Sequence, residues 1–383
     1  MTDRISAAYD KVCRVLLDRQ TQNKHWDGRL SDSALSTATA VSAFCVFRRS
    51  LQKHQLTADE FRQIESLIAQ STNWLLAHQN PDGGWGDTDK SISNVSTTFL
   101  VKSALRLAMA VGERQTADDS RNVDVYLQRA GGIDAIKRRY GSDQTFSVPI
   151  LTNAALAGLV EWKDIPQLPF EAAALPMACF RFVKMNVVSY AVPALVAIGQ
   201  VRFHFYRERG RFIGNFIRRL VKKRTLRLIE RMQPASGGYL EAAPLTSFVV
   251  MSLSAMGLTD HPIVTKGIRF LLQTVRAGGS WAIDTNLATW LTSLAVSALP
   301  FPRAASAVEH NLWELDNTST INWLLSCQHK QWHPFTGALP GGWGWTDLSG
   351  GVPDADDTAA ALLALASQYE ANSKRDAGEG SVR

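Results

Sequence analysis

The 383-residue sequence is poor in cysteine and contains no long apolar run. Its four cysteines (Cys13, Cys45, Cys179 and Cys327) lie far apart, so neither a disulfide framework nor a zinc site is indicated. The longest apolar stretch, Val187–Ile198, contains a proline and is too short to span a bilayer. We therefore expect the cysteines to be small core residues of a helical protein in a reducing compartment.

Signals for export and for metal binding are also lacking. The segment Met1–Ile5 does not have the charged and then apolar pattern of a signal peptide. The eight histidines form no helical pair at ligand spacing. His329 and His333 are four residues apart, but Pro334 and the glycine-rich sequence around them favour a loop. From the residues we predict no metal site and no cofactor.

What the sequence does have is a repeated pattern of a helix end, a glutamine, a glycine-rich turn and an aromatic residue. After most of these turns, small hydroxyl residues open a second apolar helix, as at Ser36–Thr37 and Ser96–Thr98. Repeats of this kind predict an all-α toroid of helix pairs, in which the glutamine and the aromatic residue tie successive pairs together. The five glutamine and aromatic pairs are Gln20 with Trp26, Gln79 with Trp85, Gln233 with Tyr239, Gln273 with Trp281, and Gln328 with Trp343.

The fifth turn differs from the others because acids follow it. Asp354, Asp356 and Asp357 fall just before the helix-forming run Ala359–Leu365. One aspartate is enough to cap a helix, so capping leaves two carboxyl groups unexplained. Crowded carboxylates repel one another, and in a desolvated site one of them tends to stay protonated. The cluster is therefore a candidate Brønsted acid, and Trp345 lies just upstream of it.

These repeats and the motif Asp354–Ala359 resemble the squalene–hopene cyclase family of class II terpene cyclases, from about Ala8 to about Gln368. Segments around Gly131, Thr145–Pro149, Val188–Pro193 and Asp284–Trp290 are also similar to that family. The resemblance implies an (α/α)6 toroid of the terpene cyclase and prenyltransferase type, followed by the opening helices of an incomplete second toroid.

By this resemblance, Asp356 donates a proton to a terminal isoprene double bond, with Asp354 and Asp357 as its supports. Trp345, Trp290 and Tyr190 match aromatic residues that stabilise the resulting cation, although Tyr190 stands where such cyclases commonly have a tryptophan. The implied function is protonation-initiated cyclisation of a linear isoprenoid such as squalene to a polycyclic triterpene, without metal or cofactor.

The expected domains follow from the span of the repeats. Residues 1–36 form an N-terminal helix that packs with the second domain, and residues 37–305 form a complete toroid. Residues 306–370 begin the second toroid, and residues 371–383 form a disordered tail. Since only the opening of the second toroid is expected, a second chain that completes the fold is a possible partner.

The segment Arg202–Arg231 holds eleven lysines or arginines against two glutamates, in a chain of net charge +6. Basic residues alternate with apolar ones there, as in a helix that rests on anionic headgroups; an ordinary solvated outer helix is the alternative. No nucleic-acid reader is evident. For a lipid-modifying protein we expect a peripheral position on the cytoplasmic side of the membrane.

Two other interpretations stay open. The chain is either an independent cyclase or an incomplete homologue that does not turn over substrate by itself. Carboxylates and tryptophans on an α/α toroid also suit a carbohydrate-active enzyme such as an inverting glycosidase, although the inner helices have few hydroxyl groups for sugars. A protein prenyltransferase subunit is less favoured because its zinc-binding residues are missing.

Overall fold

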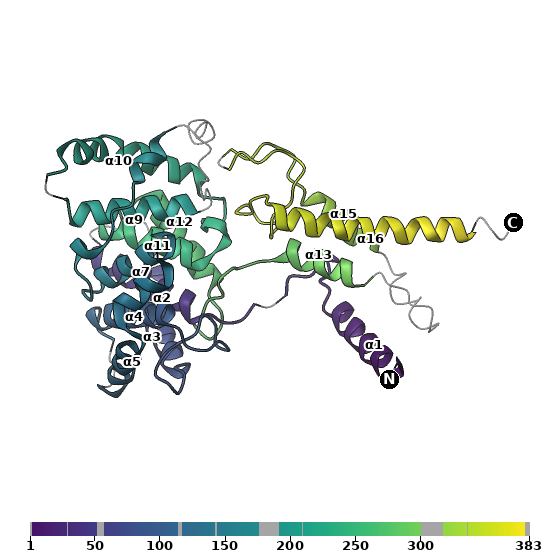
Figure 1. Ribbon diagram of the computed structural model, residues 1–383, viewed down its shortest axis with the longest axis horizontal. Coiled ribbons are helices and arrows are strands. Elements are labelled where there is room, and N and C mark those ends of the chain that lie inside the picture. The colour runs from purple at the N-terminus through teal and green to yellow at the C-terminus, as the bar shows by residue number, and fades with distance from the viewer. Residues whose placement is uncertain are drawn as a thin grey trace. The chain divides into compact units, whose positions relative to one another are not determined.

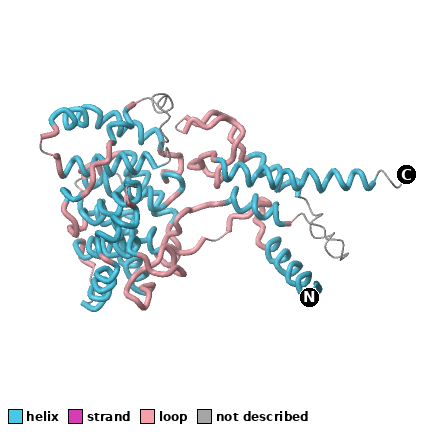
Figure 2. The backbone as a smooth tube through the Cα atoms, in the orientation of Figure 1, coloured by secondary structure: helices cyan, strands magenta, loops and turns pink. Residues whose placement is uncertain are grey.

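The structure is a computed structural model, and every described residue lies in a helix, a turn or a loop (Figure 2). It confirms the predicted all-α class. The chain divides into two compact units: unit 1 comprises Met1–Arg29 with Asn286–Arg383, and unit 2 comprises Leu30–Thr285. The unit boundaries thus fall earlier than the expected breaks after residues 36 and 305. The described residues are 2–28, 30–51, 57–113, 117–141, 144–175, 191–208, 210–299, 317–334 and 336–379.

Unit 2 is a ring of inner helices with outer helices around it (Figure 1). Its inner helices are α2 (Ala34–Ser50), α4 (Val95–Ala110), α7 (Gln144–Leu156), α9 (Val192–Phe205) and α11 (Ala243–Ala255). Each packs against the next, and α11 packs against α2, which closes the ring. We expected six pairs; the described residues of unit 2 place five inner helices in this ring, and residues 176–190 lie outside them.

The outer helices are amphipathic, whereas the inner ones are buried on most sides. In α11 every residue from Thr246 to Ser254 is buried, and in α2 every residue from Ser36 to Phe47 is. Small residues suit such helices because they let neighbouring backbones approach closely. The outer elements are α3 (Ala58–Ala77), α5 (Ala117–Ala130), α6 (Gly132–Tyr140), α10 (Phe212–Met232) and α12 (Pro262–Thr274), with short 3-10 turns η1 (Trp162–Asp164), η2 (Phe170–Ala174) and η4 (Tyr239–Glu241).

Unit 1 contains α1 (Thr2–Asp18), α13 (Ala288–Ala298), α15 (Asn317–Ser326) and α16 (Ala355–Glu379). Helices α13 and α16 pack together, and their apolar core includes Trp26, Leu324 and Trp343. Helix α16 continues past residue 371 to Glu379, which differs from the expected disordered tail over residues 371–379. Between Ala355 and Ala377 the helix has neither glycine nor proline to stop it.

The aromatic residue of every repeat is buried and makes the same hydrogen bond. Its polar side-chain atom donates to a main-chain carbonyl in the last turn of the preceding helix, where carbonyls lack the usual i+4 partner within the helix. The bonds are Trp26 to Leu16 (2.7 Å), Trp85 to Leu75 (2.8 Å), Tyr239 to Ile229 (2.7 Å), Trp281 to Leu271 (2.9 Å) and Trp343 to Leu324 (2.8 Å).

A second bond joins the turn to an inner helix. The backbone N–H of Trp85 donates to the hydroxyl of Thr98 (2.9 Å), at the start of the helix that follows it in sequence. Trp281 instead donates to Thr37 (3.1 Å), so the last turn of unit 2 is fastened to its first inner helix. The ring is thus closed by this hydrogen bond as well as by the packing of α11 against α2.

The first repeat makes the reciprocal exchange in unit 1. The backbone N–H of Trp26 donates to Thr292 of α13 (3.0 Å), and not to Thr37 of the helix that follows it. The two turns have therefore exchanged inner-helix partners. This exchange is the reason that Met1–Arg29 belongs to the same unit as the C-terminal helices.

Candidate active site

The three aspartates lie at the N-terminus of α16, as predicted. Asp354 is the cap of this helix, because its Oδ1 accepts the backbone N–H of Asp357 (2.8 Å) and its carbonyl accepts that of Thr358 (3.2 Å). Asp354 and Asp356 are exposed, whereas Asp357 is only 8% exposed. The sequence analysis expected one carboxyl group to stay protonated if the site is desolvated, and the resemblance assigned the acid to Asp356. In the structure the buried carboxyl group is that of Asp357.

Burial raises the pKa of Asp357 to about 7, and its hydrogen bond to Asp354 and the negative charges of Asp354 and Asp356 act in the same direction. Near neutral pH this carboxyl group therefore holds a proton for a large fraction of the time. A protonated carboxyl group next to an exposed carboxylate is an arrangement suited to general acid chemistry.

A tight loop positions the cluster. Its two ends pair through an isolated bridge, in which the backbone N–H of Asp354 donates to the carbonyl of Trp343 (3.1 Å). Thr358 Oγ1 accepts the backbone N–H of Trp343 (3.0 Å), which is the same bond that other repeats make. Gly344 must be glycine here, since a Cβ at this position would lie 2.6 Å from the carbonyl oxygen of Val352.

The structure brings together the two predicted tryptophans. The backbone N–H of Trp290, in the first turn of α13, donates to the carbonyl of Trp345 (3.1 Å). Trp290 is 43% exposed, and Trp345 is partly buried with an indole nitrogen that has no hydrogen-bond partner among the described residues. Tyr190, the third predicted aromatic residue, lies outside the described residues.

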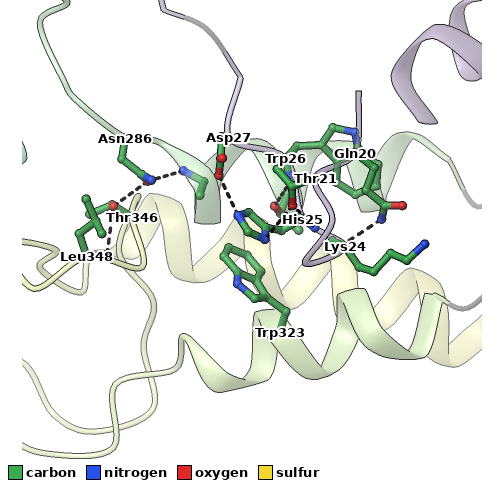
Figure 3. A network of polar contacts seen from close by, with 12 residues as sticks. Gln20, Thr21, Lys24, His25, Trp26, Asp27, Asn286, Trp323, Thr346 and Leu348 are labelled. Atoms are coloured by element: carbon green, nitrogen blue, oxygen red, sulfur yellow. Dashed lines mark hydrogen bonds and ion pairs between the residues drawn. The ribbon is translucent and has the colours of Figure 1, made fainter. Parts of the chain in front are cut away.

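Asn286 fastens the loop to α13 and was missed in the sequence. Its Oδ1 accepts the backbone N–H of Ala288 (2.8 Å) and the hydroxyl of Thr346 (2.8 Å), as Figure 3 shows. Thr346 Oγ1 also accepts the backbone N–H of Leu348 (3.2 Å). The only signal in the sequence was an asparagine two residues before a helix-forming run, which is typical of a cap.

His25 is a second residue that the sequence did not single out. Its Nε2 lies 2.7 Å from Asp27 Oδ1, and its ring stacks on Trp323 of α15 with centroids 4.3 Å apart and planes 4° apart (Figure 3). Gln20 Nε2 also donates to Thr320 Oγ1 (2.9 Å). These contacts hold the N-terminal segment within unit 1, and about 300 residues of sequence separate the partners.

In the described part of the chain, no group of three or more histidine, cysteine, aspartate or glutamate side chains is arranged to hold a metal ion. Burial lowers the pKa values of His329 and His333, and their rings meet edge to face with centroids 6.2 Å apart. They lie in the loop that Pro334 indicated.

Comparison with known proteins agrees with the all-helical fold. Residues 9–199 match the family described as the squalene-hopene cyclase N-terminal domain. The chain is 23% identical over 410 residues to the squalene hopane cyclase afumA of Aspergillus fumigatus, a match that covers 90% of this chain and 50% of that protein. It is also 23% identical over 407 residues to the squalene–hopene cyclase of Alicyclobacillus acidocaldarius, with 93% and 59% covered.

A third relative is the terpene cyclase–glycosyl transferase fusion protein fsoA of Humicola fuscoatra, 23% identical over 421 residues, with 90% of this chain and 29% of that protein covered. The chain thus spans between 29% and 59% of the length of these relatives. The family match, the helical toroid with its repeated aromatic turns and the aspartate cluster lead to one conclusion. The chain belongs to the squalene–hopene cyclase family.

Proposed function

We propose that the aspartate cluster of unit 1 starts the cyclisation of a linear isoprenoid such as squalene by protonating a terminal double bond. The observation that supports this most is the crowding of three carboxyl groups at the start of α16, with the pKa of Asp357 raised to about 7. In this proposal Asp356 delivers the proton. Asp357 holds a proton beside it, and Asp354 fixes the helix end and adds negative charge.

The reaction needs a cation to survive without being trapped. Once the π electrons of the alkene take the proton, the positive charge moves along the isoprenoid as rings close, and loss of a proton ends the reaction. Aromatic faces stabilise such a cation by about 1–2 kcal/mol each without acting as nucleophiles. The main-chain hydrogen bond between Trp290 and Trp345 supports assigning this role to both tryptophans, and Tyr190 is assigned to it by resemblance alone.

Unit 1 by itself leaves this chemistry open to water. Asp356 and Trp290 are exposed, and so are apolar side chains of the same two helices, including Leu294 and Leu363, the latter at 67%. Carbocation chemistry requires that water be excluded. We therefore propose that further α/α helix pairs must cover unit 1 before it converts substrate. Without such helices, the protein is a homologue that does not turn over substrate independently.

Helix α10 is the proposed membrane contact. Five large apolar side chains on its N-terminal half are exposed, led by Phe212 at 82% and Ile213 at 78%. The exposed basic residues Arg219, Lys223, Arg224 and Arg227 follow along the same helix. A face of this kind suits a helix that lies in the interface, with its basic end at anionic headgroups. In the described part of the chain, no helix has both the length and the apolar character needed to cross a bilayer.

Two basic residues of the predicted segment do not belong to this surface. Arg218 is only 6% exposed and pairs with Glu171 (3.0 Å), and Arg202 is buried against the carbonyls of Ile165 and Tyr206. Release from anionic vesicles is therefore tested by changing Arg219, Lys223, Arg224 and Arg227 to glutamine. Each is expected to contribute about 1 kcal/mol at low ionic strength. Binding that ignores both these changes and salt would refute the membrane contact.

Turnover is tested with squalene in detergent, with cyclic isomers of the same mass as the readout. The chain is assayed alone and together with the C-terminal part of the Alicyclobacillus relative that lies beyond the matched region. We expect little product from the chain alone, product from the mixture, and none when Asp356 is changed to asparagine. Efficient cyclisation by the chain alone would overturn the need for further helices. Absence of product from every mixture would overturn the substrate assignment.

A further inference from the structure

Unit 2 holds a surplus of positive charge where the end of α9 meets α10. Three arginines there have carboxylate partners: Arg218 pairs with Glu171 (3.0 Å), Arg211 pairs with Glu208 (2.9 Å), and Arg202 lies 3.6 Å from Glu208. Among the described residues no carboxylate pairs with Arg207 or with Lys222. Arg207 and Lys222 are thus two cationic side chains without a carboxylate partner in the described part of this region.

The main chain of Lys222 is hydrogen-bonded to a side chain of α9. Its carbonyl accepts the amide of Gln200 (3.2 Å), which also donates to Thr225 Oγ1 (2.9 Å). Gln200 lies one helical turn before His204, so Lys222 is fixed next to the last turn of α9. Its side chain is half-buried, unlike that of Lys223, which is exposed. An ammonium group that loses water without gaining an anionic partner costs free energy.

Arg207 is placed at the same junction by Phe203. The guanidinium carbon of Arg207 lies 5.5 Å from the centroid of this ring, and that of Arg218 lies 6.0 Å from it. Arg218 is neutralised by Glu171, so Arg207 supplies the uncompensated charge. The fixed ring limits the freedom of Arg207, which reduces the entropy that it would lose on binding a ligand.

His204 is the third polar group at this junction, because it lies one helical turn after Gln200 on α9. Partial burial lowers its pKa, and the positive charges of Lys222 and Arg207 lower it further. Burial and the charge of Arg207 also lower the pKa of Lys222. The charges of Arg207 and Lys222 repel each other, and an anion that binds between them relieves this repulsion.

Cations at the C-terminus of a helix are stabilised by its dipole, and this explains His204 without any ligand. It does not explain Lys222, which lies in the middle of α10. A phosphate monoester has about two negative charges and three acceptor oxygens, which match the two cations without a carboxylate partner and the imidazole N–H of His204. The exposed apolar residues Phe205 and Phe212 lie on either side of this junction in the chain, so an acyl chain attached to the phosphate has a surface to contact.

We propose that His204, Arg207 and Lys222 form a binding site for the phosphate monoester headgroup of a membrane lipid. The site rests on the proposed docking of α10 at a membrane and adds selectivity to it. General attraction to anionic lipid follows the surface potential of the bilayer, whereas this site distinguishes a terminal phosphate from a phosphodiester of equal charge density. Figure 1 shows α9 and α10, the two helices that meet there.

The test compares two sets of vesicles with equal surface potential, one containing phosphatidic acid and the other phosphatidylglycerol. We expect about tenfold tighter binding to phosphatidic acid, which corresponds to one or two charge-assisted hydrogen bonds. Lys222→Gln and Arg207→Gln should each remove most of this preference. Lys223→Gln, the neighbouring change with the same loss of charge, should weaken binding to both vesicles alike and keep the preference. Circular dichroism checks that all variants are folded.

Three results would overturn the proposal. Equal binding of the unchanged protein to both vesicles would refute selectivity for a monoester, while leaving the membrane contact of α10 intact. A preference that Lys222→Gln and Arg207→Gln leave unchanged would place the selectivity elsewhere. If neither vesicle binds, the membrane contact itself fails. In that case inorganic pyrophosphate is added and the NMR signals of His204 are recorded. A shift of these signals would assign the site to a soluble phosphate, and no shift would refute the site altogether.

Discussion

The backbone N–H of Asp357 donates to Oδ1 of Asp354 across 2.8 Å. This bond gives Asp354 two functions, because it caps α16 and holds a negative charge beside the buried carboxyl group of Asp357. Asp356 lies between them in sequence but points to solvent. The cluster therefore contains the carboxyl group of Asp354, which caps the helix, the exposed carboxyl group of Asp356, and the buried carboxyl group of Asp357, whose pKa is raised to about 7.

Changing Asp357 to asparagine should alter the pH dependence of stability. The folded-state pKa of about 7 lies above the unfolded value of about 3.9. The wild type is therefore penalised by ionisation as pH rises from about 4 to about 7, and asparagine is not. Urea unfolding should show Asp357→Asn gaining free energy of unfolding relative to wild type between pH 4.5 and pH 8. Asp356→Asn removes one of the charges that raise this pKa and keeps the buried carboxyl group, so it should show a smaller gain over the same range. The same dependence in both variants would contradict the burial of Asp357.

Changing Thr37 to valine should loosen the ring of unit 2. The change removes the acceptor for the buried N–H of Trp281 (3.1 Å) while keeping the volume of the side chain. An unsatisfied buried donor costs about 1–3 kcal/mol. Thr39→Val is the matched control, since Thr39 is buried in the same helix but bonds only to carbonyls of that helix. Denaturant unfolding should give the larger loss for Thr37→Val, and equal losses would count against ring closure through this bond.

Changing Gly237 to alanine tests the packing of a repeat turn. Gly237 has φ of +87°, and a Cβ there would lie 2.6 Å from the carbonyl oxygen of Lys266. Gly257 has a similar φ of +78°, but a Cβ there would meet nothing within 4 Å. Both substitutions incur about 1 kcal/mol of backbone strain, and only Gly237→Ala adds a backbone clash. We expect a clearly lower melting temperature for Gly237→Ala than for Gly257→Ala. If Gly237→Ala lowers the melting temperature less than Gly257→Ala does, this turn is not packed as described.

Changing Arg218 to glutamine should destabilise unit 2, because it leaves Glu171 without its partner. Arg218 contacts both carboxylate oxygens of Glu171 at 3.1 Å. Breaking a buried pair costs about 3–5 kcal/mol, and the partial exposure of Glu171 puts this one at the lower end. Arg219→Gln, at the exposed neighbour, should change the free energy of unfolding by less than about 0.5 kcal/mol. Similar stabilities for the two variants would refute a structural role for the pair.

Local sequence predicted the parts of the fold that short-range chemistry determines. The repeated turns, the buried aromatic residues and the helix that begins after Asp354 all depend on contacts within about twenty residues, and the structure contains each of them. The sequence did not predict that Trp26 bonds to Thr292 and Trp281 bonds to Thr37. Both threonines follow an equivalent turn, and only the packing of whole helices decides which one each tryptophan meets.

The sequence predicted which residues make up the candidate site but not which of their side chains are buried. Asp356 and Asp357 are adjacent, so their side chains project about 100° apart on the helix, and the packing of α16 decides which is buried. Sequence alone named the cluster and could not choose Asp357 as the desolvated member. The stacking of His25 on Trp323 was equally out of reach, because no local pattern connects residues so distant in the chain.

The most direct test of the proposed chemistry is the origin of the proton. Squalene is incubated in D₂O with the chain and the complementing C-terminal segment, and the products are analysed by mass spectrometry. Protonation by an exchangeable aspartic acid predicts cyclic products with a deuterium from solvent at the terminal methyl group, and no product from Asp356→Asn. Cyclic product without solvent deuterium, or undiminished product from Asp356→Asn, would contradict the account.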